Sequence, residues 1–211
     1  MDHLRKFLGS TLALAYAQSH PDHVGCIVIA GVTTTRRSEI DWLYRGMAPL
    51  FPEEWYHFGE ALPPELRELD RVNAYHQLLN DPDEQVRLKA ARDWHEWEAA
   101  TILLADPAGL PRRWSDPRYL LTRARIATHY FREGAWLEDG ILLKNAGRLA
   151  GIPGILIHGR WDMEAPLVTA WELARVWPGV ELVVLPKAAH STANADIAAA
   201  IVAATNRFRD L

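Results

Sequence analysis

One stretch of the sequence, residues 152–167, constrains the fold more than any other. It contains a short apolar run at residues 155–158, with Pro153 and Gly154 before it and Gly159 after it. A run of this kind is typical of an inner strand of a parallel sheet, which is covered on both faces. Asp162 follows just past the expected carboxyl end of the strand, where open α/β sheets carry their chemistry. The stretch therefore predicts an α/β fold with an acidic residue at the functional edge of a parallel sheet.

A second strand is predicted at residues 181–185, and His190 lies just beyond its end. An acid after one strand and a histidine after the next, in this chain order, match the second half of a Ser…Asp…His triad on an α/β-hydrolase sheet. A third strand is predicted earlier in the chain, at residues 24–30, directly after an alanine-rich helix that ends before Pro21. Leu12, Ala15 and Tyr16 share one face of that helix.

The middle of the chain contains no convincing strand pattern between about residues 33 and 140. Helices are predicted there at residues 38–45, 51–58, 62–79, 83–104 and 119–131. We interpret this region as a helical cap inserted between two strands of the sheet. The expected organisation is the N-terminal part of a truncated α/β-hydrolase core at residues 1–32, the cap at 33–145 and the C-terminal part of the core at 146–211, with helices at 168–177 and 196–208.

Composition limits the classes of function. The 211 residues carry a net charge of −4 and no basic block, so nucleic acid is not an expected partner. Cys26 is the only cysteine, which excludes an internal disulfide and is typical of a reducing compartment. Neither a signal peptide nor a membrane-spanning stretch is recognisable. We therefore expect a cytoplasmic protein that has no membrane partner.

Several long motifs resemble one known family. They are Gly9-Ser-Thr-Leu-Ala-Leu-Ala-Tyr-Ala-Gln-Ser-His-Pro21, Arg36-Arg-Ser-Glu-Ile-Asp-Trp42, Leu50-Phe-Pro-Glu-Glu-Trp55, Trp94-His-Glu-Trp-Glu98, Ala124-Arg-Ile-Ala-Thr-His-Tyr-Phe131 and His158-Gly-Arg-Trp-Asp162. On these motifs the chain resembles the proline iminopeptidases (prolyl aminopeptidases), serine peptidases of the α/β-hydrolase fold with a helical cap. The resemblance runs from about Gly9 to the C-terminus, and the family's first strands and oxyanion loop have no counterpart here.

The resemblance implies a role for three residues. Asp162 matches the family's catalytic aspartate and His190 its general base, while Glu98 matches a cap glutamate that holds the protonated amine of the substrate's N-terminal proline. A buried ammonium needs such a counter-charge. No metal and no cofactor are implied, and the substrate would be a small peptide or amide. The alternative roles are a helix-capping aspartate near Pro166, a surface histidine and a glutamate on a solvated helix face.

Two departures from the family pattern affect the expected activity. Phe7 stands where the resemblance places the nucleophilic serine of the Gly-x-Ser-x-Gly elbow, and it has no nucleophilic atom. Ser10 falls three residues later, inside the predicted helix, and is expected to be structural. Ala127 replaces a second amine-binding glutamate, which weakens the prediction of N-terminal proline as the substrate.

The number of predicted strands is small for an α/β hydrolase. We therefore expect a truncated, inactive form that is poorly stable alone or associates with itself through an exposed sheet edge. The hypotheses left open are a serine aminopeptidase whose full form cleaves through an acyl-enzyme, a non-catalytic binding protein derived from a hydrolase, and an esterase or amidase of the same fold.

Overall fold

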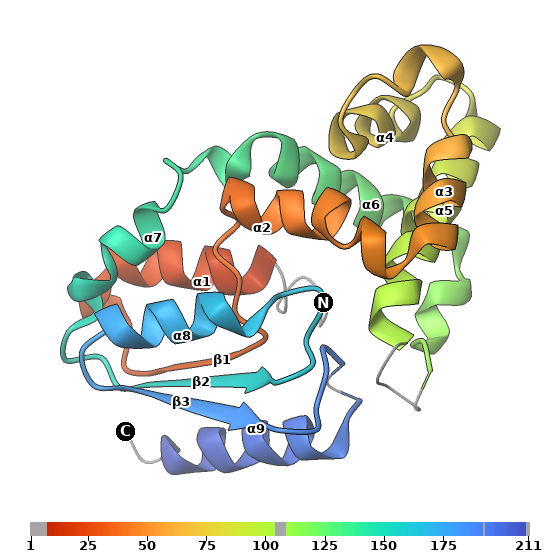
Figure 1. Cartoon of the computed structure of the whole chain (residues 1–211). Helices are drawn as coiled ribbons and strands as arrows, with labels where there is room; N and C mark the ends of the chain where they lie inside the picture. The colour runs from red at the N-terminus through yellow and green to blue at the C-terminus, as the bar shows by residue number, and fades with distance from the viewer. Residues whose placement is uncertain (1–7, 104–108, 192, 210–211) are drawn as a thin grey trace. The chain divides into compact units, whose positions relative to one another are not determined.

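The computed structural model describes residues 8–103, 109–191 and 193–209. The chain divides into two compact units (Figure 1). The first, here called the sheet unit, comprises Met1–Glu39 and Glu138–Leu211, and the second, the helical unit, comprises Ile40–Leu137. Each unit is described by itself below.

The sheet unit is built on three parallel strands in the order β1-β2-β3. They are β1 (Ile27–Ala30), β2 (Gly154–Gly159) and β3 (Val180–Leu185), with Ile27 opposite Gly154 and Gly154 opposite Val180. The predicted α/β class and its three strands are confirmed in the described residues. The prediction that β1 begins at residue 24 is wrong. The ladder starts at Ile27, whose N–H donates to the Pro153 carbonyl at 2.9 Å, and Pro153 has no N–H to extend it.

Helices cover both faces of this sheet. Figure 1 shows α8 (Leu167–Val176) on one face and α9 (Ala195–Arg207) on the other. Every residue of β2 is buried, as expected of a central strand between two helical layers. Against the α9 face, Ala204 packs on Ile155 and Ile157. One apolar core therefore joins the three strands to α9.

Helix α1 (Leu8–Ser19) buries a different face from the one that its spacing suggested. Leu14 and Ala17 are buried, whereas Leu12 and Tyr16 are 45% and 52% exposed. The alanine-rich sequence contains apolar residues on several faces, so spacing alone does not identify the packed one. A short helix, α7 (Ile141–Lys144), was not predicted and accepts a hydrogen bond from Gln18 Nε2 at the Leu142 carbonyl.

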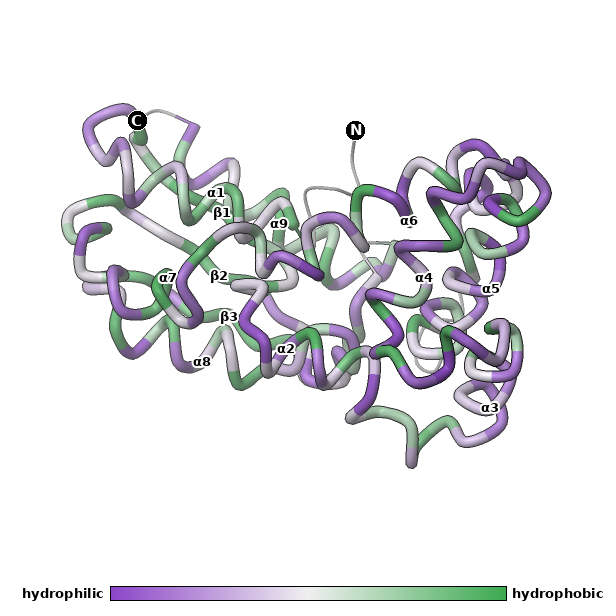
Figure 2. The backbone as a smooth tube through the Cα atoms, turned by 90° about the horizontal axis from the view of Figure 1, so that it is seen from above, coloured by the Kyte–Doolittle hydropathy of each residue, from purple (hydrophilic) through white to green (hydrophobic). Residues whose placement is uncertain are grey.

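The helical unit contains no strand in its described residues. Its helices are α3 (Pro52–Glu60), α4 (Arg71–Leu79), α5 (Glu84–Leu103) and α6 (Pro117–Arg132), and the boundary helix α2 (Arg37–Asp41) leads into it from the sheet unit. Hydrophobic and hydrophilic residues alternate along these helices (Figure 2). None of the helices in the described ranges combines the length and the hydropathy needed to cross a lipid bilayer.

One helix prediction in this unit is wrong in extent. The predicted helix at residues 62–79 forms only from Arg71, because Asp70 has an extended backbone and its side chain caps α4 by accepting from the Asn73 N–H at 3.0 Å. Pro63 and Pro64 begin a separate single turn before it. The predicted helix at 38–45 is helical throughout, but it is α-helical only to Asp41 and continues as a wider π-helix over Trp42–Gly46.

Aromatic rings form the core of the helical unit. Phe58 stacks on Tyr75 with ring centroids 4.4 Å apart and on Trp97 at 5.6 Å. Trp94 crosses both Phe58 and Tyr75 edge-on. All four side chains are at most 2% exposed. The Tyr75 hydroxyl is satisfied by donation to the Phe58 carbonyl at 2.9 Å, and burial raises its pKa far above the usual value.

Candidate active site

Asp162 lies in the loop that follows β2. It is 4% exposed, and its Oδ1 accepts a hydrogen bond from the Ala165 N–H at 2.8 Å. Helix α8 begins later, at Leu167, with Pro166 at its N-cap and no side-chain cap. Asp162 therefore closes its own turn and does not cap the helix, so the carboxylate is held in a fixed orientation at the carboxyl end of the sheet.

His190 follows β3, and the loop that carries it packs directly against Gly159. The Trp161 N–H donates to the Ala188 carbonyl at 3.0 Å, and the Arg160 N–H donates to the Leu185 carbonyl at 2.9 Å. A Cβ at Gly159 would lie 2.5 Å from the Ala188 carbonyl oxygen, closer than such atoms approach in proteins. Glycine at this position allows the two loops to meet.

The structure brings Asp162 and His190 into direct contact. The Nδ1 atom of His190 is 3.0 Å from Oδ1 and 2.9 Å from Oδ2 of Asp162. Burial alone would raise the pKa of Asp162, but the charge and hydrogen bond of His190, together with the hydrogen bond from the Ala165 N–H, outweigh it and hold the pKa below its usual value. Asp162 is therefore ionised at neutral pH and faces an imidazole that it can orient.

Glu164 is a member of this cluster that the sequence analysis missed. Its Oε2 lies 3.2 Å from Nε2 of His190, and its side chain is 3% exposed. The imidazole of His190 thus lies between two buried carboxylates, Asp162 on Nδ1 and Glu164 on Nε2. The one available signal was an acidic residue two positions after Asp162 in an otherwise apolar stretch.

The sequence analysis also missed His158, at the end of β2, which contacts the turn that carries Asp162. Its Nδ1 accepts from the Val32 N–H at 3.2 Å and its Nε2 is 2.6 Å from the Ala165 carbonyl, to which it donates. These partners require the neutral tautomer with the proton on Nε2. Because Nε2 is also 3.7 Å from Oδ2 of Asp162, His158 ties the Asp162 turn to the residues that follow β1.

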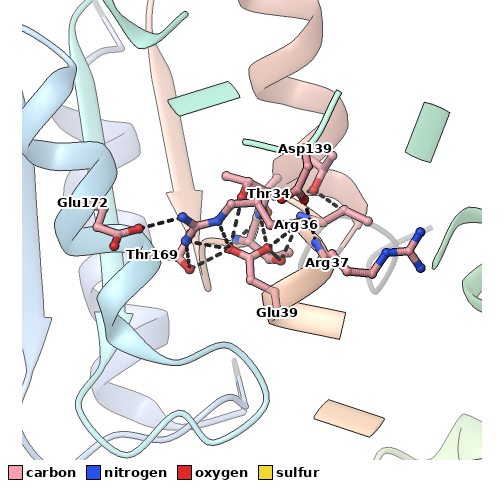
Figure 3. Close-up of polar contacts among 11 residues, drawn as sticks. Thr34, Arg36, Arg37, Glu39, Asp139, Thr169 and Glu172 are labelled. Atoms are coloured by element: carbon pink, nitrogen blue, oxygen red, sulfur yellow. Dashed lines mark hydrogen bonds and ion pairs between the residues drawn. The ribbon is translucent and has the colours of Figure 1, made fainter. Parts of the chain in front are cut away.

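A polar network anchors the start of α8, the helix that follows this turn (Figure 3). Its centre is the buried carboxylate of Glu39, which accepts from Thr169 Oγ1 on α8 at 2.6 Å and from the Thr34 N–H at 2.9 Å. Arg36 binds Glu39, Thr169 and, at 2.8 Å, Glu172 of α8. These contacts fix the segment after β1 to the first turns of α8. Because α8 follows the loop that carries Asp162 and Glu164, they also fix the end of that loop.

The position that the resemblance assigns to the nucleophile is not described by the structure. Phe7 lies outside the described residues. Ser10 is 1% exposed, and its Oγ donates to the Thr33 carbonyl at 2.8 Å and accepts from the Thr33 N–H at 2.9 Å. Ser10 therefore joins α1 to the segment after β1, which agrees with the structural role expected for it.

Glu98 belongs to the helical unit and is 3% exposed. Its carboxylate accepts from the Tyr44 hydroxyl at 3.0 Å and from Trp94 Nε1 at 2.9 Å, and it forms an ion pair with Arg123 of α6. Burial would raise the pKa of Glu98, but the charges of Arg123 and His95 and these hydrogen bonds leave it below the usual value. The alternative of a solvated helix face is excluded, because this carboxylate is buried and already paired with a cation.

The surroundings of Arg123 extend this ion pair. Its guanidinium lies over the Trp114 ring, 5.0 Å from the centroid, and 3.0 Å from His95 Nε2. Burial, partly offset by the charge of Glu98, lowers the pKa of His95 to about 4, so this histidine is neutral at pH 7. Ala127 is buried one helical turn beyond Arg123 on α6. In the described residues no group of three histidine, cysteine or acidic side chains is arranged to hold a metal ion.

Comparison with known proteins identifies the relatives of this chain. No protein-family model matches it. It is 41% identical over 202 residues to a proline iminopeptidase of Xylella fastidiosa (strain 9a5c), covering 95% of this chain and 64% of the relative. Relatives of the same name are 38% identical in Arabidopsis thaliana, covering 96% of this chain and 54% of theirs, and 39% identical in Neisseria gonorrhoeae, covering 93% and 62%. The chain thus spans between 54% and 64% of the length of these curated relatives.

Proposed function

Because the chain belongs to the proline iminopeptidase family, we propose that its sheet unit supplies the aspartate and the histidine of a serine aminopeptidase site. The observation that carries this proposal is the contact of His190 Nδ1 with both carboxylate oxygens of Asp162, at 2.9 and 3.0 Å. The two residues follow adjacent parallel strands at the edge where such sheets hold their active sites. Their chain order is that of an α/β-hydrolase triad.

In this function each member of the pair has a distinct task. Asp162 accepts the Nδ1–H of His190, fixes the tautomer and stabilises the imidazolium that forms during the reaction. His190 uses Nε2 to remove the proton from a serine hydroxyl as the serine attacks the substrate carbonyl. It then returns that proton to the departing amine, which leaves an acyl-enzyme for water to hydrolyse.

The serine is the part that this sequence does not offer. Phe7 occupies the position that the family resemblance assigns to the serine. The Oγ atom of Ser10 is hydrogen-bonded to the backbone of Thr33. Loss of the nucleophile costs on the order of a millionfold in rate. We therefore expect this chain by itself to be inactive as a hydrolase.

Glu98 is the proposed recognition residue for the substrate's N-terminal amine. A buried carboxylate suits that role, and its ionised state at neutral pH supports it. Arg123 already balances its charge, and Ala127 adds no second carboxylate. An N-terminal ammonium group would have to compete with the guanidinium of Arg123, so we propose a peptide or amide substrate with weakened preference for a free N-terminal proline.

The proposal is tested by supplying the missing parts. The test protein joins residues 9–211 to a segment with the first strands, oxyanion loop and Gly-x-Ser-x-Gly elbow that the family resemblance implies, and hydrolysis of proline 4-nitroanilide is measured beside a panel of other amides and esters. We expect the unmodified chain to show no turnover and the grafted protein to show turnover that His190→Ala abolishes. Asp162→Asn should lower the rate by about four orders of magnitude.

Two results would overturn the proposal. One is a folded grafted protein without hydrolytic activity, which would favour the non-catalytic binding role. The other is activity that survives His190→Ala. Faster turnover of esters or of blocked amides than of the proline anilide would retain the Asp162–His190 chemistry and replace the aminopeptidase by an esterase or amidase.

A further inference from the structure

We propose that Glu164 is a lock on His190: its buried carboxylate occupies Nε2, the atom through which the histidine would act as a base, and releases it only when displaced. The inference deepens the proposed function and rests on it for the role of His190 as base. The contact itself belongs to the described residues of the sheet unit and stands on its own geometry.

Both nitrogens of His190 face acids. Nδ1 lies 2.9 Å from Oδ2 of Asp162, and Nε2 lies 3.2 Å from Oε2 of Glu164. A ring nitrogen and a carboxylate oxygen at such distances attract each other only when a proton lies between them, because two lone pairs would otherwise meet. Asp162 fixes a proton on Nδ1, so a proton is also required between Nε2 and Glu164.

Burial makes this arrangement strong. The side chains of Asp162 and Glu164 are 1% and 3% exposed and that of His190 is 10% exposed, so water screens their charges little. Among the described residues, Asp162 and Glu164 from the loop after β2 contact the ring, and His158 on β2 lies 3.7 Å from Asp162 through its Nε2. Two carboxylates against one imidazole favour its cationic, doubly protonated form, in which Nε2 cannot accept a further proton.

The consequence concerns catalysis directly. A serine hydroxyl must come within about 2.6–3.2 Å of a histidine nitrogen to pass its proton. Glu164 occupies that distance at Nε2, so a nucleophile and Glu164 compete for one atom. The structure thus assigns Glu164 as a positioning residue that sets when His190 is available, while Asp162 sets how it is oriented.

The test is the titration of His190 in the present chain, followed by NMR of its ring ¹H and ¹⁵N nuclei and assigned with His190→Ala. Glu164→Gln removes the charge and keeps the shape, and it should move the titration midpoint of His190 to lower pH by about one unit or more. Glu181→Gln is the matched control, because Glu181 is an exposed β3 residue paired with Arg207 in the same unit. In Glu181→Gln the titration midpoint of His190 should stay within about 0.2 pH units of its value in the original chain, since exposed pairs interact weakly.

Glu164→Asp provides a second variant that keeps the charge and shortens its reach by one methylene, so an intermediate midpoint is expected. Equal midpoints in the original chain, Glu164→Gln and Glu164→Asp would overturn the lock. Titration does not depend on turnover. A shift in Glu164→Gln beside a grafted protein without hydrolysis would therefore overturn the proposed function and leave the contact between Glu164 and His190 intact.

An active grafted protein allows a kinetic test of the same inference. Glu164→Gln should move the acid limb of the pH profile for kcat/KM to lower pH by about one pH unit, because His190 would then lose its Nε2 proton at a lower pH. An unmoved acid limb in that protein would contradict the lock.

Discussion

Each of the two units buries an acid that is ionised at neutral pH, Asp162 in one and Glu98 in the other, and the two acids are neutralised in different ways. Asp162 in the sheet unit is paired with the imidazole of His190, a group that can gain and lose a proton near neutral pH. Glu98 in the helical unit is paired with the guanidinium of Arg123, which stays charged at every accessible pH. For both acids, burial raises the pKa, and the charge of the partner lowers it below the usual value. The chemistry of the partner, and not the burial of the acid, therefore distinguishes a pair that can exchange a proton from a static ion pair.

The supporting elements differ in the same sense. Asp162, Glu164 and His190 stand on loops after β2 and β3, where the strands fix their ends and the loops set their orientation. Glu98 and Arg123 stand on the long helices α5 and α6, packed among stacked aromatic rings. The proposed catalytic pair is thus held at the carboxyl edge of the sheet, whereas the ion pair joins two helices of the other unit.

The largest effect should come from breaking the static pair. Arg123→Leu leaves the buried carboxylate of Glu98 without its cation and should lower the free energy of unfolding by about 3–5 kcal/mol. Urea denaturation followed by tryptophan fluorescence measures it. The double variant Arg123→Leu with Glu98→Gln should recover much of the loss.

The matched control for this prediction is Lys89→Leu, which removes the exposed cation of the Lys89–Asp93 pair on α5. It should change the free energy of unfolding by at most about 0.5 kcal/mol. A loss for Arg123→Leu no larger than for Lys89→Leu would show that Glu98 is not held by an internal counter-charge.

The next largest effect tests how the sheet unit brings its two loops together. Gly159→Ala places a methyl group against the Ala188 carbonyl and should cost about 2 kcal/mol as the loops are pushed apart. The contact between Asp162 and His190 should weaken at the same time, which NMR of the His190 ring would report. Gly147→Ala is the control, because nothing lies within 4 Å of the added carbon. Equal stability of the two variants would contradict the close approach at Gly159.

Asp162→Asn removes the charge from the pair without changing its shape. At pH 7 it should cost roughly 2 kcal/mol, the range for a hydrogen bond to a charged group. The pKa of Asp162 is lowered in the folded chain, so its stabilising contribution is present above the ordinary value of 3.8 and is lost as the pH falls through the folded value. The difference from the original chain should therefore shrink below pH 3.8. A constant difference from pH 7 to pH 2 would mean that the pKa of Asp162 is not lowered.

The smallest effect concerns His95 beside the static pair. Its pKa falls to about 4 in the folded chain from 6.5, so the unfolded chain binds a proton first as the pH drops. Stability should therefore fall by about 1 kcal/mol between pH 6.5 and 5.5 because of this residue. His95→Gln should remove that part of the acid sensitivity, and the exposed His57→Gln should not. Denaturation curves at both pH values measure it, and equal slopes for the two variants would contradict it.

The sequence predicted the parts of the molecule that local pattern determines. Short apolar runs bounded by glycine and proline identified β2 and β3, and the positions of Asp162 and His190 after them led to a site that the structure brings together. The break before Arg71 was missed, because apolar residues continue at helical spacing across Asp70 and only its capping geometry ends the pattern. In α1 the exposed Leu12 and Tyr16 could not be separated from the buried Leu14, since that depends on tertiary contacts.

The missed site residues share a physical reason. Glu164 and Arg123 matter because each meets an opposite group that is distant in sequence, His190 in one case and Glu98 in the other. Charged residues on a loop or a helix are usually solvated, so neither residue type nor spacing distinguishes these two. Only the fold shows that Glu164 lies against His190 and that Arg123 pairs with the buried Glu98.

The aspartate–histidine pair is preassembled in this chain, and the hydrogen bond on His190 Nδ1 is its clearest signature. In ¹⁵N-labelled protein we expect a strongly downfield-shifted Nδ1–H proton that exchanges slowly with water. It should disappear in His190→Ala and move upfield in Asp162→Asn, while His57→Gln leaves it unchanged. A His190 ring whose Nδ1 proton exchanges as fast as that of an exposed histidine, or whose resonance ignores Asp162→Asn, would contradict the account.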